Sequence, residues 1–222
     1  MDWAAFRLSV QLGVTTLVFL IPLSIALGRL LAVRRFPGHD VVEAVVALPL
    51  ILPPTVLGFY LLVAFGGRSW IGSAFSSLTG GTLAFSFEGL VLASMLVNLP
   101  FAVQPIQRAF EAVPREVREA AACCGMTWWR ALAAIELPLA WPGIATAVVL
   151  TFAHTLGEFG VVLMVGGSIP GETRTLSIAI YDRVQAFDDR GAGIMAATLL
   201  AMATVALALT TRLTRRLGGR HG

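Results

Sequence analysis

Nucleophilic and metal-binding side chains are sparse in this 222-residue sequence, and their spacing argues against catalytic chemistry. All 16 basic residues are arginine, which excludes a Walker phosphate loop and a lysine Schiff base because both require lysine. Cys123 and Cys124 are adjacent, a spacing that suits neither a disulfide framework nor a four-ligand zinc site. We interpret them as small apolar side chains, and any energy from ATP must come from another chain.

An intramembrane enzyme would still need a recognisable catalytic group. The sequence contains no G-x-S-x-G and no H-E-x-x-H motif, and His154 has no cysteine or second histidine near it in its apolar segment. We therefore expect no catalytic residue, no metal site and no cofactor. An activity assay on the chain in detergent tests this expectation.

The composition indicates a membrane protein. Apolar residues make up 57% of the chain and charged residues 13%, and the mean hydropathy is +0.81. Soluble domains carry about twice that share of charge, and a soluble fold of this size cannot bury so much apolar surface. Lipid is therefore the expected solvent for part of the chain.

Stretches that lack aspartate, glutamate and arginine mark the expected membrane spans. They predict five helices at about residues 8–30, 44–66, 89–107, 137–157 and 191–211. Each charge-free stretch holds roughly 19 to 24 residues, enough to cross a hydrocarbon core about 30 Å thick. These stretches must be helical, since an unsatisfied peptide group is costly in hydrocarbon. The sequence thus predicts an all-α membrane protein with a single transmembrane domain over residues 1–222.

The distribution of arginine predicts the orientation. With the N-terminus outside, eleven arginines lie inside: Arg29, Arg34, Arg35, Arg108, Arg115, Arg118, Arg130, Arg212, Arg215, Arg216 and Arg220. The other five lie outside, and the opposite orientation reverses the ratio. Because short cytoplasmic loops are enriched in arginine and lysine, we expect the N-out/C-in arrangement.

The second expected span contains two consecutive prolines, Pro53 and Pro54, followed by Thr55. Each proline removes a helix hydrogen bond, and the freed carbonyl groups are tolerated at membrane depth only against protein or water. This stretch is therefore expected to line a pathway, although simple packing is the alternative.

The inside loop at residues 108–136 is expected to form a helix, a glycine and a second helix. Pro114 and Glu116 suit the first turn of a helix, and alanines from Ala120 onward continue it. Gly125 provides a left-handed stop, and a second helix from about residue 127 leads to the Leu137-Pro138 stop. An amphipathic helix lying on the membrane is the competing interpretation.

This loop resembles that of the permease subunits of bacterial ABC importers. Their signature is EAA, three residues, Gly, nine residues and I-x-L-P, and both spacings are present here. The matching residues are Glu119, Ala120, Ala121, Gly125, Ile135, Leu137 and Pro138. The resemblance implies that the first helix couples to an ATPase subunit, with alanines that permit close approach and Glu119 available to a partner side chain.

Four further stretches resemble permeases for tetrahedral oxyanions, and most closely those for molybdate. They lie at residues 48–58, 156–160, 166–171 and 173–178, and the Ile180–Ala186 stretch also favours molybdate over sulfate or thiosulfate. The resemblance covers nearly the whole chain. Sulfate permeases share part of these patterns, so a sulfate, thiosulfate or tungstate permease is the alternative within this class.

Weakly polar groups are the expected lining of an anion pathway, since a strong fixed charge would trap a divalent anion. The candidate residues are Pro53, Pro54, Thr55, Ser94, Asn98, Thr151, Glu158 and Arg174. For most of them ordinary helix packing is the alternative. Glu158 repels anions, so we expect it to hold the 166–171 loop. Arg174 is expected to attract the anion or to meet an acidic docking surface, and the alternative is solvation or pairing with Glu172 and Asp182.

The resemblance also implies the assembly. The expected protein is a multi-pass, five-span permease of the type I importer (MetI-like) fold in the bacterial inner membrane, acting as a homodimer with two cytoplasmic ATPase subunits. A periplasmic molybdate-binding protein delivers the substrate, membrane lipid surrounds the helices, and no nucleic acid takes part. An ATP-independent channel or carrier is the alternative from another class, but no internal repeat is evident in the hydropathy pattern.

Overall fold

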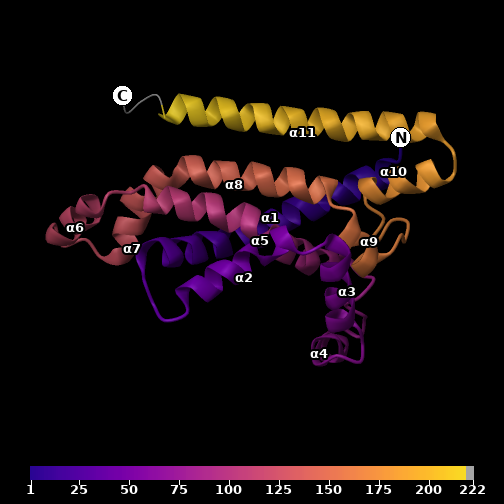
Figure 1. The fold of residues 1–222 in the computed structure, drawn as a ribbon, viewed down its shortest axis with the longest axis horizontal. Helices are drawn as coiled ribbons and strands as arrows, with labels where there is room; N and C mark the ends of the chain where they lie inside the picture. Colours follow the sequence, from indigo (N-terminus) through magenta and orange to yellow (C-terminus); the bar gives the residue numbers. More distant parts are fainter. Residues whose placement is uncertain (219–222) are drawn as a thin grey trace.

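The computed structural model describes residues 1–218, and every element in that range is a helix. In chain order the helices are α1 (Trp3–Val33), α2 (His39–Ile51), α3 (Pro54–Phe65), α4 (Trp70–Thr79), α5 (Phe87–Glu111), α6 (Arg115–Cys123), α7 (Trp128–Ala131), a π-helical turn η1 (Leu132–Glu136), α8 (Leu137–Gly157), α9 (Gly160–Gly166), α10 (Leu176–Gln185) and α11 (Asp189–Gly218). Figure 1 shows α6 and α7 at one end of the molecule and α10 at the other.

Four long apolar segments lie side by side along the length of the molecule (Figure 1). They are α1, α5, the continuous stretch from α7 to α8, and α11, each long and apolar enough to cross a membrane. The pair of α2 and α3 makes a fifth candidate span if the two are counted together. The chain is thus an all-α, multi-pass membrane protein, as its composition predicts.

The second expected span, at residues 44–66, contains two helices that meet at an angle of 112°. Helix α2 ends at Ile51, and Leu52 and Pro53 have extended backbone before Pro54 opens α3. Pro53 has no N–H to continue the helix, and its carbonyl accepts the first bonds of α3, from Val56 and Leu57. The double proline therefore redirects the chain, and α3 and α4 extend sideways from the bundle (Figure 1).

Helix α5 is the central helix of the bundle. It packs against α1 and α8, and Leu90, Ala93, Ala102, Val103 and Ile106 are completely or almost completely buried along it. Small residues let the helices approach closely, as is usual in membranes.

Gly143 marks the closest approach of α5 and α8. A Cβ atom at Gly143 would lie 2.4 Å from the Ala109 Cβ and 2.7 Å from the Pro105 carbonyl oxygen. We expect Gly143→Ala to lower the stability of the purified chain by about 1–3 kcal/mol, because the backbone must shift to admit the methyl group. Thermal unfolding in detergent measures this change.

Gly193→Ala is the matched control, since a Cβ at Gly193 on α11 meets no atom within 4 Å. There the same methyl group is expected to be neutral or stabilising, by up to about 1 kcal/mol. Equal effects of the two substitutions would contradict the close contact of α5 and α8.

The helix after Gly125 does not stop at Leu137-Pro138, contrary to the expectation from sequence. It runs from α7 through η1 into α8 without a break, up to Gly157. Within η1 the Leu137 N–H bonds the Leu132 carbonyl, five residues back. This wider turn lies just before Pro138 and gives its ring the room that a regular α-turn would deny, so the proline is accommodated inside the helix.

The end of the molecule opposite α6 contains the short helices α9 and α10, and side-chain hydrogen bonds hold the loops that connect them. Thr173 Oγ1 donates to the Gly166 carbonyl at 2.6 Å and accepts from the Ile169 N–H at 3.2 Å, which holds the 166–171 loop. Asp188 caps α11 by accepting from the Gly191 N–H at 2.9 Å. This hydrogen bond, together with the adjacent Arg183 guanidinium, lowers the pKa of the Asp188 carboxyl from its usual value.

Candidate functional site: the α6 elbow and the α2–α3 pocket

The helix–glycine–helix unit at residues 115–131, here called the elbow, is closed by a paired set of backbone hydrogen bonds. After α6 ends, Gly125 adopts φ +73° and its N–H bonds the Ala122 carbonyl at 2.9 Å. The Met126 N–H bonds the Ala121 carbonyl at 3.1 Å. These two bonds form a Schellman motif, which requires a left-handed residue just after the helix. Gly125 therefore has the left-handed conformation that the sequence predicts.

The EAA segment lies on α6, at the tip of the molecule (Figure 1). Glu119 and Ala120 are exposed, and Ala121 is buried against the rest of the elbow. Glu119 accepts from Arg115 Nε at 2.7 Å, one turn away, but both side chains remain largely open to solvent. Such an exposed pair contributes little to stability, so Glu119 remains available to another protein.

The second half of the motif anchors the elbow to the bundle. Leu137 packs in a cluster with Ile106 and Phe110 of α5, and Ile135 is half-buried. Glu136, between them, is buried with 3% of its side chain exposed. It is the only acid in the I-x-L-P segment.

Glu136 joins three helices through two arginines. Arg29 of α1 donates to both Glu136 oxygens, from Nε at 2.9 Å and from Nη2 at 2.8 Å. Arg118 of α6 places its Nε 3.6 Å from Oε2 and donates from Nη2 to the Phe110 carbonyl at 2.5 Å. One buried carboxylate thus ties the elbow to α1 and to the start of α8, and we call this group the Glu136 triad.

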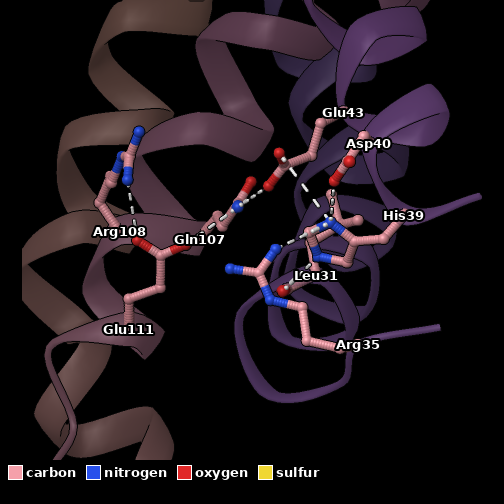
Figure 2. Close-up of polar contacts among 8 residues, drawn as sticks. All are labelled: Leu31, Arg35, His39, Asp40, Glu43, Gln107, Arg108 and Glu111. Carbon is pink, nitrogen blue, oxygen red and sulfur yellow. Dashed lines mark hydrogen bonds and ion pairs between the residues drawn. The ribbon is translucent and has the colours of Figure 1, made fainter.

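A second polar cluster joins α2 to the end of α5, just before the elbow (Figure 2). The Gln107 side-chain amide donates to Glu43 at 2.6 Å and to Glu111 at 3.0 Å. Arg108 donates to the other Glu111 oxygen at 3.0 Å. The start of α2 and the last turn of α5 are therefore held together beside the connection to α6.

His39 is buried at the start of this cluster. Its Nε2 lies 2.9 Å from the Leu31 carbonyl and so carries the hydrogen, which leaves Nδ1 to accept from Arg35 at 3.4 Å. Nδ1, Asp40 and Glu43 also lie within 4.8 Å of one another, the spacing of a metal site. The Arg35 guanidinium takes the lone pair that a cation would need and adds positive charge, so these residues do not suit a metal.

A pocket of about 210 Å³ lies at the break between α2 and α3. Pro49 of α2 and Leu52 in the break line it, with Pro54 of α3, His154 in the last turn of α8 and Glu158 just after that helix. The sequence singles out Pro54 and Glu158 as pathway candidates, and the fold places both at this pocket. The side chains of His154 and Glu158 thus face the break between α2 and α3 across this pocket.

Behind the pocket, Asn98 connects α5 to α8. Its amide nitrogen donates to the Ser94 carbonyl at 2.8 Å and to Thr155 at 3.1 Å. Its oxygen therefore accepts from His154 Nδ1 at 3.1 Å, which turns the other ring nitrogen toward Glu158 Oε2, 3.9 Å away. The ring also stacks on Phe101, with centroids 4.1 Å apart. These contacts fix the imidazole at the pocket wall.

The other pathway candidates lie apart from the pocket lining. Ser94 and Thr151 are buried between helices, and their hydroxyl oxygens have no hydrogen-bond partner among the described residues. Pro53 and Thr55 are exposed at the start of α3. Arg174, at the end of the molecule remote from the elbow, has its Nε 3.1 Å from Asp182 and its Nη1 3.9 Å from Asp2. Pairing with Asp182 is one of the alternatives that the sequence leaves open for Arg174.

Glu158 does not hold the 166–171 loop, which corrects the expectation from sequence. Its carboxylate accepts from the Val161 N–H at 3.0 Å at the start of α9, and its carbonyl accepts from Ser177 at 2.7 Å. Thr173 holds the loop instead. This local bond to the first turn of α9 keeps Glu158 at the pocket.

The Glu136 triad is the part of the candidate site that the sequence does not predict. Arg29 and Glu136 each border a charge-free stretch, so in the sequence they mark only where a span ends. Oppositely charged residues at the same end of two adjacent spans are candidates for pairing, and this signal was present in the sequence.

Comparisons with known proteins show which family the chain belongs to. Residues 21–219 match the family described as the binding-protein-dependent transport system inner membrane component. The chain is 48% identical to the molybdenum transport system permease protein ModB of Azotobacter vinelandii, over 84% of this chain and 83% of that protein. It is 37% identical to ModB of Escherichia coli K12, over 99% of this chain and 97% of that protein.

Sulfate systems and solved structures extend the comparison. A probable sulfate transport system permease protein of Chlorella vulgaris is 33% identical over 79% of this chain and 65% of that protein. A bacterial ABC transporter that imports alginate has a chain with a TM-score of 0.73, 19% identity, and coverage of 95% of this chain and 79% of that one. That structural likeness shows the fold. This chain therefore belongs to the family of inner membrane components of binding-protein-dependent transport systems.

Proposed function

We propose that the chain is the permease subunit of an ATP-driven molybdate importer in the bacterial inner membrane. The observation that carries the proposal is the elbow, a rigidly closed helix–glycine–helix unit that projects from the bundle and bears the importer signature. The names of relatives that are 37% to 48% identical support molybdate over sulfate.

The elbow is the proposed contact with the ATPase. It presents exposed small and charged residues, and the Glu136 triad ties it to α1 and α8, so a displacement of α6 reaches the bundle as a rigid-body motion. Because this chain contains no lysine for a phosphate loop, two separate ATPase subunits bind and hydrolyse ATP. The proposed arrangement is N-out/C-in with the elbow in the cytoplasm, which the distribution of arginine supports.

The pocket at the α2–α3 break is the proposed part of the anion pathway. Pro54, Glu158 and His154 line it, and Asn98 holds His154 in place. A single copy leaves large apolar side chains exposed on α3 and α4, among them Tyr60, Trp70 and Leu78. In the proposed homodimer, part of this surface faces the second copy, and the pathway lies on the two-fold axis.

The proposed cycle alternates access. Closure of the ATPase dimer on ATP moves the two elbows together and opens the pathway outward, where a periplasmic binding protein delivers molybdate. Hydrolysis resets the elbows and releases the anion inward. The pocket has no guanidinium among its lining residues, and the Glu158 carboxylate repels anions, so a divalent anion would not be trapped there.

Transport in proteoliposomes tests the proposal. The chain is reconstituted with the phosphate-loop ATPase subunit and the solute-binding protein of the same organism, and uptake of radioactive molybdate is measured with and without ATP. We expect uptake that needs all three proteins and ATP, and that excess sulfate reduces little. Uptake without the ATPase would instead indicate a channel or carrier. Strong competition by sulfate or tungstate would mean that the preferred substrate is that anion and not molybdate.

A further inference from the structure

A groove of about 760 Å³ runs along α1 on the elbow side of the molecule. One wall is the face of α1 from Pro22 to Val33 together with Arg34, and the other is formed by Trp128 and Trp129 of α7 with Leu132. Eleven helical steps lead from Pro22 to Val33, so the groove is roughly 17 Å long. Its dimensions suit an acyl chain with a headgroup at one end.

The two ends of the groove differ in polarity. Pro22, Ile25 and Ala26 lie within the expected span at residues 8–30, at hydrocarbon depth, and no acidic residue lines the groove. Arg29 and Arg34 line the other end, where the charge-free stretch of α1 finishes. The groove is thus apolar where the membrane is apolar and positively charged at the membrane surface.

Arg34 has no acidic partner. Its side chain is exposed and forms no hydrogen bond or ion pair with any residue that the structure describes, and the same is true of the side chain of Arg130, next to Trp129. Arg29 pairs with Glu136 and also lies 5.9 Å from the centre of the Trp128 ring. Since Glu136 neutralises only one of its two arginines, the surroundings of the groove keep a net positive charge.

Trp128 and Trp129 form an aromatic wall beside the positively charged end of the groove. Their rings stack with centroids 3.6 Å apart, and 54% of Trp128 and 64% of Trp129 remain exposed. Tryptophan is favoured at the boundary between hydrocarbon and headgroups, because one part of the ring is apolar and its N–H seeks a polar partner. Such exposed rings do not belong to a closed protein core.

We propose that this groove binds an anionic phospholipid, with its headgroup at Arg34 and Arg130 and an acyl chain along α1 between the helix and the tryptophans. A basic pocket between membrane helices suits an anionic headgroup. A soluble ATPase subunit cannot reach the part of the groove at hydrocarbon depth, and the surface proposed above to face a second copy lies on α3 and α4, not on α1 and α7. The inference does not depend on which side of the membrane the elbow occupies.

Quenching of tryptophan fluorescence by brominated lipid tests the proposal on the full chain in nanodiscs. Two sets of discs contain the same fractions of phosphatidylglycerol and phosphatidylcholine, and the bromine atoms are on the acyl chains of one lipid or of the other. We expect stronger quenching by brominated phosphatidylglycerol, with a roughly fivefold preference for each unpaired arginine. Substitution of both Trp128 and Trp129 by phenylalanine should remove this excess and leave the quenching of the other tryptophans unchanged.

The charge is tested with Arg34→Gln, which should remove most of the preference. Arg68→Gln is the matched control, because Arg68 is equally exposed, also has no described partner, and lies in the connection between α3 and α4, away from the groove. Equal quenching by the two lipids, or an unchanged excess in Arg34→Gln, would overturn the proposal. Loss of the excess on addition of the ATPase subunit would show that protein covers the groove instead.

The readout needs neither ATP nor molybdate, so it is separate from the test of transport. Selective quenching without molybdate uptake would leave the lipid site standing and remove the proposed substrate. Molybdate uptake without selective quenching would support the proposed substrate and overturn the lipid site.

Discussion

Glu136→Ala is expected to lower the stability of the chain by about 2–4 kcal/mol, because it leaves two arginines near the membrane surface without their shared carboxylate. The value lies below that of a fully buried pair, since 23% of the Arg29 side chain and 21% of the Arg118 side chain are exposed. Thermal unfolding of the purified chain in detergent measures the loss. Glu136→Gln keeps the shape and one acceptor, so we expect an intermediate value.

The control for Glu136→Ala is Glu119→Ala, which removes an acid from the same elbow. Its partner Arg115 lies one turn away and is 86% exposed, so the loss should be no more than about 0.5 kcal/mol. A double-mutant cycle that combines Glu136→Ala with Arg29→Ala isolates the pair. If the two single changes added independently, Arg29 and Glu136 would not be coupled, and the proposed anchoring of the elbow to α1 would be wrong.

Loss of the Glu136 triad should also weaken the coupling between ATP hydrolysis and molybdate import. Without Glu136, α6 would keep its proposed contact with the ATPase but lose the charged link from Arg118 to α1, so part of its displacement would no longer reach the bundle. The number of molybdate ions imported per ATP hydrolysed should fall in the reconstituted complex, while the ATPase activity persists. A fall of both rates in proportion would indicate unfolding and not uncoupling.

The sequence predicts those features of the structure that depend on only a few neighbouring residues. The left-handed turn at Gly125 and the break at Pro53 and Pro54 follow from backbone chemistry that acts within a few residues of the site. The apolar stretches predicted long helices for the same reason. Such features need no knowledge of which helices become neighbours.

Features that depend on helix packing could not be predicted in the same way. Glu136 and Arg29 are 107 residues apart, and Asn98 and His154 are 56 residues apart. Their pairing depends on which faces of α1, α5 and α8 meet, and a nearly uniform apolar helix does not record this. The prediction that the helix stops at Leu137-Pro138 was wrong for another reason. A π-helical turn accommodates a proline that would end a regular α-helix.

Gly125→Ala is expected to reduce molybdate uptake per ATP hydrolysed by roughly five- to thirtyfold. A left-handed conformation costs a residue with a side chain about 1–2 kcal/mol, which is enough to favour other conformations of the elbow by that factor. No atom lies within 4 Å of the added Cβ, so the effect comes from backbone conformation and not from a clash. Uptake and ATP hydrolysis are measured together in proteoliposomes that contain the complete complex.

Two variants separate the geometry of the elbow from general backbone strain. Gly80 ends α4 with φ +75°, donates its N–H to the Ser76 carbonyl, and has nothing within 4 Å of an added Cβ, as at Gly125. Gly80→Ala introduces comparable strain far from the elbow, so it should lower stability with little change in the ratio of uptake to hydrolysis. Gly125→Asn should restore much of the coupling, because asparagine adopts the left-handed conformation more readily than alanine. If Gly125→Ala and Gly125→Asn both left the ratio unchanged, the angle of the elbow would have no part in transmitting the motion of the ATPase.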